Sequence, residues 1–193
     1  MTVHHPGEHI KDVKAAFKYL KEGNERFVSG NLHKWDHKTS REIIVSGQKP
    51  FAIILTCSDS RTPPEIYFDQ GIGNIFVIRN AGNFPDATAL GSIEFGVEHL
   101  KAVLVVVVGH DKCGAVNTAH SGATGLSENL QKALDMIKEG VADDQSEEDA
   151  MCTNVEVCVD IIKNNPVIQK LGTKVIGAIY SIGSGVVEFI EEC

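Results

Sequence analysis

Apolar residues recur along this chain at two different spacings, and the two spacings predict two kinds of structural element. Over residues 9–29 they return every three or four positions among Lys and Glu, as on one face of an α-helix. We therefore expect an amphipathic helix that ends near Gly30, with an apolar face that docks on the core or on a partner subunit. Residues 31–38 are mostly polar, with Trp35 among them, and favour a loop.

Three continuous apolar runs follow, at residues 51–55, 75–78 and 102–108. Short runs rich in β-branched residues are typical of strands that are covered on both faces, as in a parallel sheet. Residues 86–100 lie between the second and third runs and have helical spacing, so they supply a crossover helix. The pattern predicts an α/β fold.

The second half of the chain extends this fold. Residues 127–140 and 147–164 have helical spacing and are separated by an acidic stretch that favours a solvated turn. Residues 174–181 and 185–190 favour two strands joined by a glycine-rich turn. We expect a single domain over residues 1–193, with a mainly parallel central sheet covered by helices, an N-terminal helical arm at residues 1–30 and a C-terminal β-hairpin.

Composition and charge narrow the classes of function. The chain has 193 residues and a formal net charge of -8, without the clustered Lys and Arg that nucleic acids and anionic membranes require. No apolar run approaches the roughly 20 residues of a membrane span, and no secretory leader is evident at the N-terminus. These features predict a soluble, cytoplasmic protein with neither a nucleic-acid nor a membrane partner.

The cysteines and glycines exclude two further kinds of site. Five cysteines without compact spacing argue against a secreted disulfide framework, which leaves metal binding or burial. Cys152 and Cys158 lie about 240° apart around a helix, so they cannot chelate one metal there. Gly71-x-Gly73 and Gly183-x-Gly185 lack the rest of a dinucleotide fingerprint, so we predict no NAD site.

Reactive side chains follow two of the predicted strands. Cys57 follows the first run after Thr56, whereas His110 and Cys113 follow the third. The carboxyl ends of parallel strands share one edge of a sheet, where α/β proteins place their sites. Two thiols and an imidazole form a soft ligand set suited to zinc, with a fourth position left open in a catalytic site. The alternative is two buried cysteines and one hydrogen-bonded histidine without a metal.

Asp59 and Arg61 place a carboxylate and a guanidinium on the same short loop as Cys57. The arginine would keep Asp59 ionised and oriented, so that the carboxylate accepts a hydrogen bond from a zinc-bound hydroxide. The alternative is an ordinary surface ion pair, which contributes little. The position beside the predicted ligand favours the catalytic interpretation.

Four sequence motifs closely resemble those of the β-class carbonic anhydrases. They are CSDSR at residues 57–61, FVIRNAGN at 76–83, GSIEFGVEHL at 91–100 and GHDKCGA at 109–115. The resemblance covers about residues 10–190. It implies a lyase, carbonate dehydratase, that hydrates carbon dioxide to bicarbonate and a proton by attack of a zinc-bound hydroxide.

The resemblance also assigns residues to roles by position. The zinc ligands would be Cys57, His110 and Cys113, and the catalytic pair would be Asp59 and Arg61. The substrate-binding residues would be Gln48, Phe76, Phe95 and Gly114. In this family the substrate pocket is built across a subunit interface, so we expect a homodimer or a larger homo-oligomer.

One branch of that family carries an inhibitory bicarbonate site, with Trp three residues before the first cysteine ligand and Gly immediately before it. This chain has Ile54 and Thr56 at those positions. It is therefore more similar to the plant-like branch, and we predict water rather than Asp59 as the fourth zinc ligand near neutral pH.

Two other functions remain open from the sequence. The same scaffold could hydrolyse carbonyl sulfide or carbon disulfide, which are linear molecules like carbon dioxide. Alternatively, the zinc could have only a structural role, although a structural site closes its shell with a fourth protein ligand and would need neither Asp59 nor Gln48.

Overall fold

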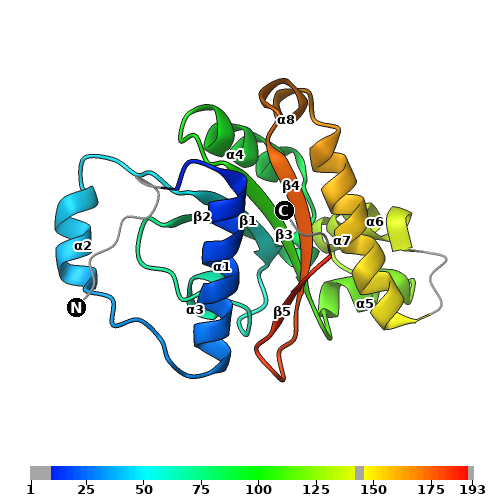
Figure 1. The fold of residues 1–193 in the computed structure, drawn as a ribbon. Helices are drawn as coiled ribbons and strands as arrows, with labels where there is room; N and C mark the ends of the chain where they lie inside the picture. Colours follow the sequence, from blue (N-terminus) through cyan, green and yellow to red (C-terminus); the bar gives the residue numbers. More distant parts are fainter. Residues whose placement is uncertain (1–9, 142–145, 191–193) are drawn as a thin grey trace.

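A five-stranded sheet forms the centre of the computed structural model, which describes residues 10–141 and 146–190 (Figure 1). Its strands are β1 (Ala52–Cys57), β2 (Ile75–Asn80), β3 (Leu104–His110), β4 (Lys174–Tyr180) and β5 (Val187–Phe189), in the order β2-β1-β3-β4-β5. The first four strands are parallel, and β5 pairs antiparallel with β4. The predicted fold class is confirmed, including the closing hairpin.

The helices fall into a predicted set and an unpredicted set. The predicted ones are present as α1 (Val13–Val28), α4 (Ala87–Glu98), α6 (Glu128–Val141) and α7 (Glu147–Lys163). The others are α2 (His37–Ile44), α3 (Pro64–Tyr67), the 3₁₀ turn η2 (Ala81–Asn83), α5 (Gly114–His120) and α8 (Pro166–Leu171). The prediction of a loop over residues 31–38 is wrong for the last two residues, which belong to α2. The Asp36 carboxylate caps this helix by accepting the Thr39 N–H.

Both faces of the sheet are covered, as the continuous apolar runs predict. Every residue of β1 and β3 is buried. Ile54 and Val106 face α1 and α3, whereas Ile53 and Val105 face α4 and α7. Because successive residues of a strand point to opposite faces, two covered faces require an unbroken apolar run.

The N-terminal helix docks on the core of its own chain, which is the first of the two predicted alternatives. Ala16 and Leu20 of α1 are fully buried. The ring of Phe17 packs edge-on against that of Phe189, with 4.8 Å between the ring centroids. Burying a side chain the size of Leu20 contributes roughly 2 kcal/mol. The first nine residues of the predicted arm, and residues 142–145 of the predicted acidic turn, lie outside the described residues.

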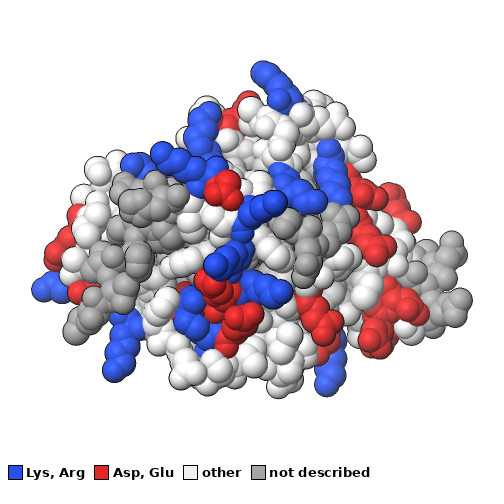
Figure 2. Space-filling view, viewed as in Figure 1, with Lys and Arg blue, Asp and Glu red and all other residues white. Residues whose placement is uncertain are grey.

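Within the described ranges, no helix combines the length and apolar character needed to cross a membrane. Figure 2 shows basic and acidic side chains interspersed on one face, with acidic ones gathered on the side where α7 lies.

A buried asparagine connects α1 to the closing hairpin. The amide nitrogen of Asn24 donates to the backbone oxygens of Tyr67 and Gly185 at 2.9 and 2.8 Å. Its side-chain oxygen accepts the N–H of Val187 at 2.9 Å. One side chain therefore satisfies three buried backbone groups, one at the end of α3 and two in the closing hairpin.

Replacing Asn24 by Ala should lower the free energy of unfolding by about 2–4 kcal/mol, because it leaves these backbone groups without partners. Urea denaturation at one protein concentration measures the change. Asn31→Ala, at an exposed position, is the control and should alter stability by less than about 0.5 kcal/mol. Equal midpoints for the two variants would contradict the role assigned to Asn24.

Candidate functional site

Three side chains with metal-binding atoms meet at the carboxyl edge of the sheet. Cys57 ends β1, His110 ends the neighbouring strand β3, and Cys113 precedes α5. Their ligand atoms all lie within 4.8 Å of one another, and the two sulfur atoms are 3.9 Å apart. All three residues are buried. The structure thus brings together the three residues that the sequence singled out.

The ring of His110 is oriented for a metal. Its Nδ1 lies 2.8 Å from the backbone oxygen of Asp111, an acceptor, so Nδ1 carries the proton. Its Nε2 is buried and has no hydrogen-bond partner among the described residues. A buried nitrogen without a partner is costly, and a metal ion would satisfy it. The donor set of two sulfurs and one imidazole nitrogen therefore fits zinc.

The two thiols differ in acidity because they are in contact. Hydrogen bonding from the Cys113 thiol lowers the pKa of Cys57 well below its usual value. The same contact raises the pKa of Cys113, because a second thiolate would lie beside the first. The pair therefore holds one negative charge readily, and a cation is needed to stabilise the second.

Beside this cluster, Asp59 and Arg61 form a two-pronged ion pair. Arg61 Nε donates to Asp59 Oδ1 at 2.9 Å, and Arg61 Nη2 donates to Oδ2 at 2.6 Å. Hydrogen bonding to Arg61 holds the pKa of the Asp59 carboxyl well below its ordinary value, although partial burial opposes this shift. The carboxylate is therefore ionised and fixed in orientation.

Arg79 supports the same loop and was not identified from the sequence. Its Nε donates to the backbone oxygen of Cys57 at 2.9 Å, and its Nη2 donates to that of Asp59 at 2.6 Å. Arg79 lies opposite Thr56 on the neighbouring strand. The one available signal was a charged residue at the end of an otherwise apolar strand, within the motif at residues 76–83.

The residues expected to bind substrate lie elsewhere in the single chain. Gln48 precedes β1, and Phe76 is the second residue of β2, so both lie toward the amino edge of the sheet. The rings of Phe76 and Phe95 are 6.4 Å apart. Cys57 is the last of the six residues of β1, so about 17 Å of strand separate it from this edge. The chain brings the two aromatic rings together but does not bring them to its own cysteine cluster.

Gly114 directly follows Cys113, as the first residue of α5. A Cβ atom at this position would meet no atom within 4 Å. The atoms of this chain therefore give no steric reason for a glycine beside the cysteine cluster.

Comparison with known sequences points to one family. A family model described as carbonic anhydrase matches residues 52–187. Carbonic anhydrase 2 of Mycobacterium tuberculosis (strain CDC 1551 / Oshkosh) is 54% identical over 106 residues, which cover 54% of this chain and 51% of that protein. A carbonic anhydrase of Synechococcus elongatus is 30% identical over 172 residues, covering 77% and 63%. The chain thus matches about half the length of the mycobacterial relative.

Comparison with solved structures agrees. A structure from a study of two tetrameric β-carbonic anhydrases of the ascomycete Sordaria macrospora matches with a TM-score of 0.69 and 27% identity, over 91% of this chain and 97% of that one. A Coccomyxa β-carbonic anhydrase in complex with acetazolamide matches with a TM-score of 0.69 and 26% identity, over 88% and 83%.

Replacing Arg79 by Ala should weaken zinc binding by about tenfold or more, because the loop that carries Cys57 loses the two hydrogen bonds that the guanidinium donates to its backbone. Competition with a chromogenic chelator measures the dissociation constant. Arg41→Ala, an exposed arginine on α2, should bind zinc as the unmodified protein does. Unchanged zinc affinity in the Arg79 variant would show that the loop keeps its shape without these bonds.

Proposed function

The chain belongs to the β class of the carbonic anhydrase family, and we propose that it is a zinc-dependent carbonate dehydratase that interconverts carbon dioxide and bicarbonate. One observation carries the proposal. Two thiols and an unpartnered imidazole nitrogen converge on one point, beside a carboxylate that an arginine holds in place. A purely structural metal site would have no use for that oriented carboxylate.

Zinc is the metal that this donor set suits best, and Cys57, His110 and Cys113 would hold it. Bound there, zinc would supply a nucleophile by lowering the pKa of a water molecule well below its usual value of about 15.7. All three of these residues are buried, so their ligand atoms are shielded from bulk solvent.

Asp59 orients the reacting group in this proposal. Both of its carboxylate oxygens are engaged by Arg61, which fixes the directions of the remaining lone pairs. An ionised carboxylate can only accept a hydrogen bond, so it holds the proton of the nucleophile away from the carbon that is attacked. The Arg61 contact also opposes movement of Asp59 onto the metal.

The same contact agrees with the plant-like branch, in which water takes the fourth zinc position near neutral pH. Ile54 and Thr56 stand where the other branch has Trp and Gly. The Thr56 hydroxyl donates to the backbone oxygen of Val108 at 3.0 Å, so this residue has a structural role within the sheet.

A second copy of the chain is required for the complete site. Gln48, Phe76 and Phe95 lie toward the opposite edge of the sheet from Cys57, so they would serve the metal centre of a neighbouring copy. Phe95 is 46% exposed in the single chain, as expected for a side chain that another subunit covers. The Sordaria macrospora enzymes are described as tetrameric. We infer a homo-oligomer that is at least a dimer.

Stopped-flow measurement of carbon dioxide hydration tests this proposal, with metal content measured in parallel. The unmodified protein should bind about one zinc per chain and be active. Cys57→Ser should lose both zinc and activity, because it removes a ligand. Asp59→Ala should keep its zinc and lose about 10- to 100-fold in kcat/KM.

Asp160→Ala removes an exposed carboxylate on α7 and should retain full activity. Full zinc content without hydration in the unmodified protein would refute the proposed function. Full activity in the Asp59 variant would remove this residue from the chemistry. Competition with carbonyl sulfide determines which linear substrate the site prefers.

A further inference from the structure

The segment between Trp35 and Phe51, which carries α2 and Gln48, extends away from the body of the chain. From residue 41 to residue 49 every side chain except Ile44 is exposed, and Val45 is 85% exposed. Figure 1 shows α2 standing apart from the sheet. A segment with so little core of its own depends on a few contacts for its position.

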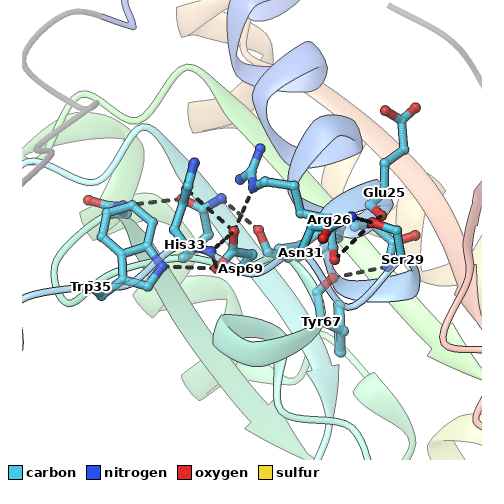
Figure 3. Close-up of polar contacts among 12 residues, drawn as sticks. Glu25, Arg26, Ser29, Asn31, His33, Trp35, Tyr67 and Asp69 are labelled. Atoms are coloured by element: carbon cyan, nitrogen blue, oxygen red, sulfur yellow. Dashed lines mark hydrogen bonds and ion pairs between the residues drawn. The ribbon is translucent and has the colours of Figure 1, made fainter. Parts of the chain in front are cut away.

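The first contact is made by Asp69. This residue follows α3 with a positive φ of 48° and is almost completely buried. Its carboxylate accepts the indole N–H of Trp35 at 3.0 Å and the backbone N–H of His33 at 3.1 Å. Figure 3 shows Arg26, His33 and Trp35 converging on it.

Arg26 supplies the charge that this buried carboxylate needs. Its Nε donates to Asp69 Oδ2 at 2.6 Å. A buried carboxylate is tolerated when it is paired and its oxygens are hydrogen-bonded, and both conditions hold here. The hydrogen bond from Trp35 therefore goes to a charged, immobile acceptor, which fixes the start of the segment.

Gly71 makes the second contact, against the ring of Trp35. A Cβ atom at residue 71 would lie 2.7 Å from Cε3 and 3.0 Å from Cζ3 of that ring. The indole therefore lies directly on the backbone, where no larger residue fits. This gives a packing role to the first glycine of the Gly71-x-Gly73 motif.

Two further contacts continue along the same stretch. A Cβ at Gly73 would lie 3.3 Å from Cδ1 of Ile44, the one side chain of residues 41–49 that is not exposed. The Phe51 N–H donates to the backbone oxygen of Asn74 at 2.9 Å. Residues 69–74 thus contact the segment at its start, near its middle and at its end.

We propose that residues 69–74 form a positioning platform for Gln48. The platform fixes the segment from Trp35 to Phe51, so that Gln48 is presented at the correct place to the metal centre of a second copy. The inference rests on the proposed function, in which Gln48 binds bicarbonate. Trp35, Asp69 and Gly71 are positioning residues, since they act through Gln48 and do not touch substrate. Misplacing a substrate-binding group by about 1 Å can cost on the order of 10²-fold in rate.

Gly71→Ala tests whether the platform holds the segment. The φ of Gly71 is not positive, so alanine suits the backbone and its methyl group displaces Trp35. Trp35 is the only tryptophan of the chain, so its fluorescence reports this contact directly. We expect red-shifted emission and about tenfold faster amide hydrogen exchange across residues 37–44, with unchanged exchange in β1 and β3 and unchanged zinc content.

Gly91→Ala is the matched control, because a Cβ there meets no atom within 4 Å. It should change neither emission nor exchange. Unchanged emission and exchange in the Gly71 variant would overturn the platform, whether or not the protein hydrates carbon dioxide.

A double-mutant cycle tests whether the platform acts through Gln48. Gly71→Ala should lower kcat/KM by about tenfold, and adding it to Gln48→Ala should lower kcat/KM no further. Trp35→Phe keeps a ring on Gly71 but removes the indole N–H, and it should show a smaller loss with the same dependence on Gln48. If Gly71→Ala lowers kcat/KM by the same factor with and without Gln48→Ala, the inference is overturned. If the unmodified protein binds zinc but is inactive, the proposed function is refuted instead. The hydrogen-exchange result for Gly71→Ala would then still show whether residues 69–74 hold the segment.

Discussion

The parallel pairing of β1 with β3 at the centre of the sheet is the constraint on which the site depends. The register places Ala52 beside Leu104 and Thr56 beside Val108, so Cys57 and His110 emerge at the same edge although 52 residues lie between them along the chain. A slip of one residue would turn every side chain of β1 to the opposite face, and each set would lose the cluster of side chains against which it packs. The spacing of the ligand atoms is therefore a property of the core and not of the loops alone.

The loops after these strands are held by charged groups that bond to backbone. Arg79 binds the carbonyls of Cys57 and Asp59, while Arg61 Nη2 reaches the carbonyl of Lys112 at 3.5 Å. On the other side, Asp111 accepts the N–H of Ile182 at 3.0 Å and so attaches the histidine loop to the closing hairpin. These bonds restrict the motion of both ligand loops before any metal binds, which reduces the entropy that binding must overcome.

The sequence predicted the parts of the molecule that local pattern controls. Unbroken apolar runs predicted the parallel strands, and reactive residues directly after two of them predicted the cysteine cluster. Short helices were missed because caps and tertiary contacts stabilise them, as the Asp36 cap does for α2. Arg79 was missed because its role depends on register, which places it opposite Thr56. The roles expected for Gln48 and Phe95 came from family resemblance alone, because no local sequence pattern shows which residues serve the site of a second copy.

Because β1 is extended, residues at its two ends cannot meet within one chain, and this makes the proposed activity depend on self-association. Cys57 ends the buried strand that Gln48 precedes, and an extended strand of this length keeps its two ends about 17 Å apart. If both residues serve one reaction, they must do so in different copies of the chain. Activity would then depend on association as well as on zinc, and a displaced Trp35 in one copy would impair the metal centre of its neighbour. The buried Asp69 carboxylate, 12 positions after Cys57 in the sequence, would thereby become part of what the proposed reaction requires.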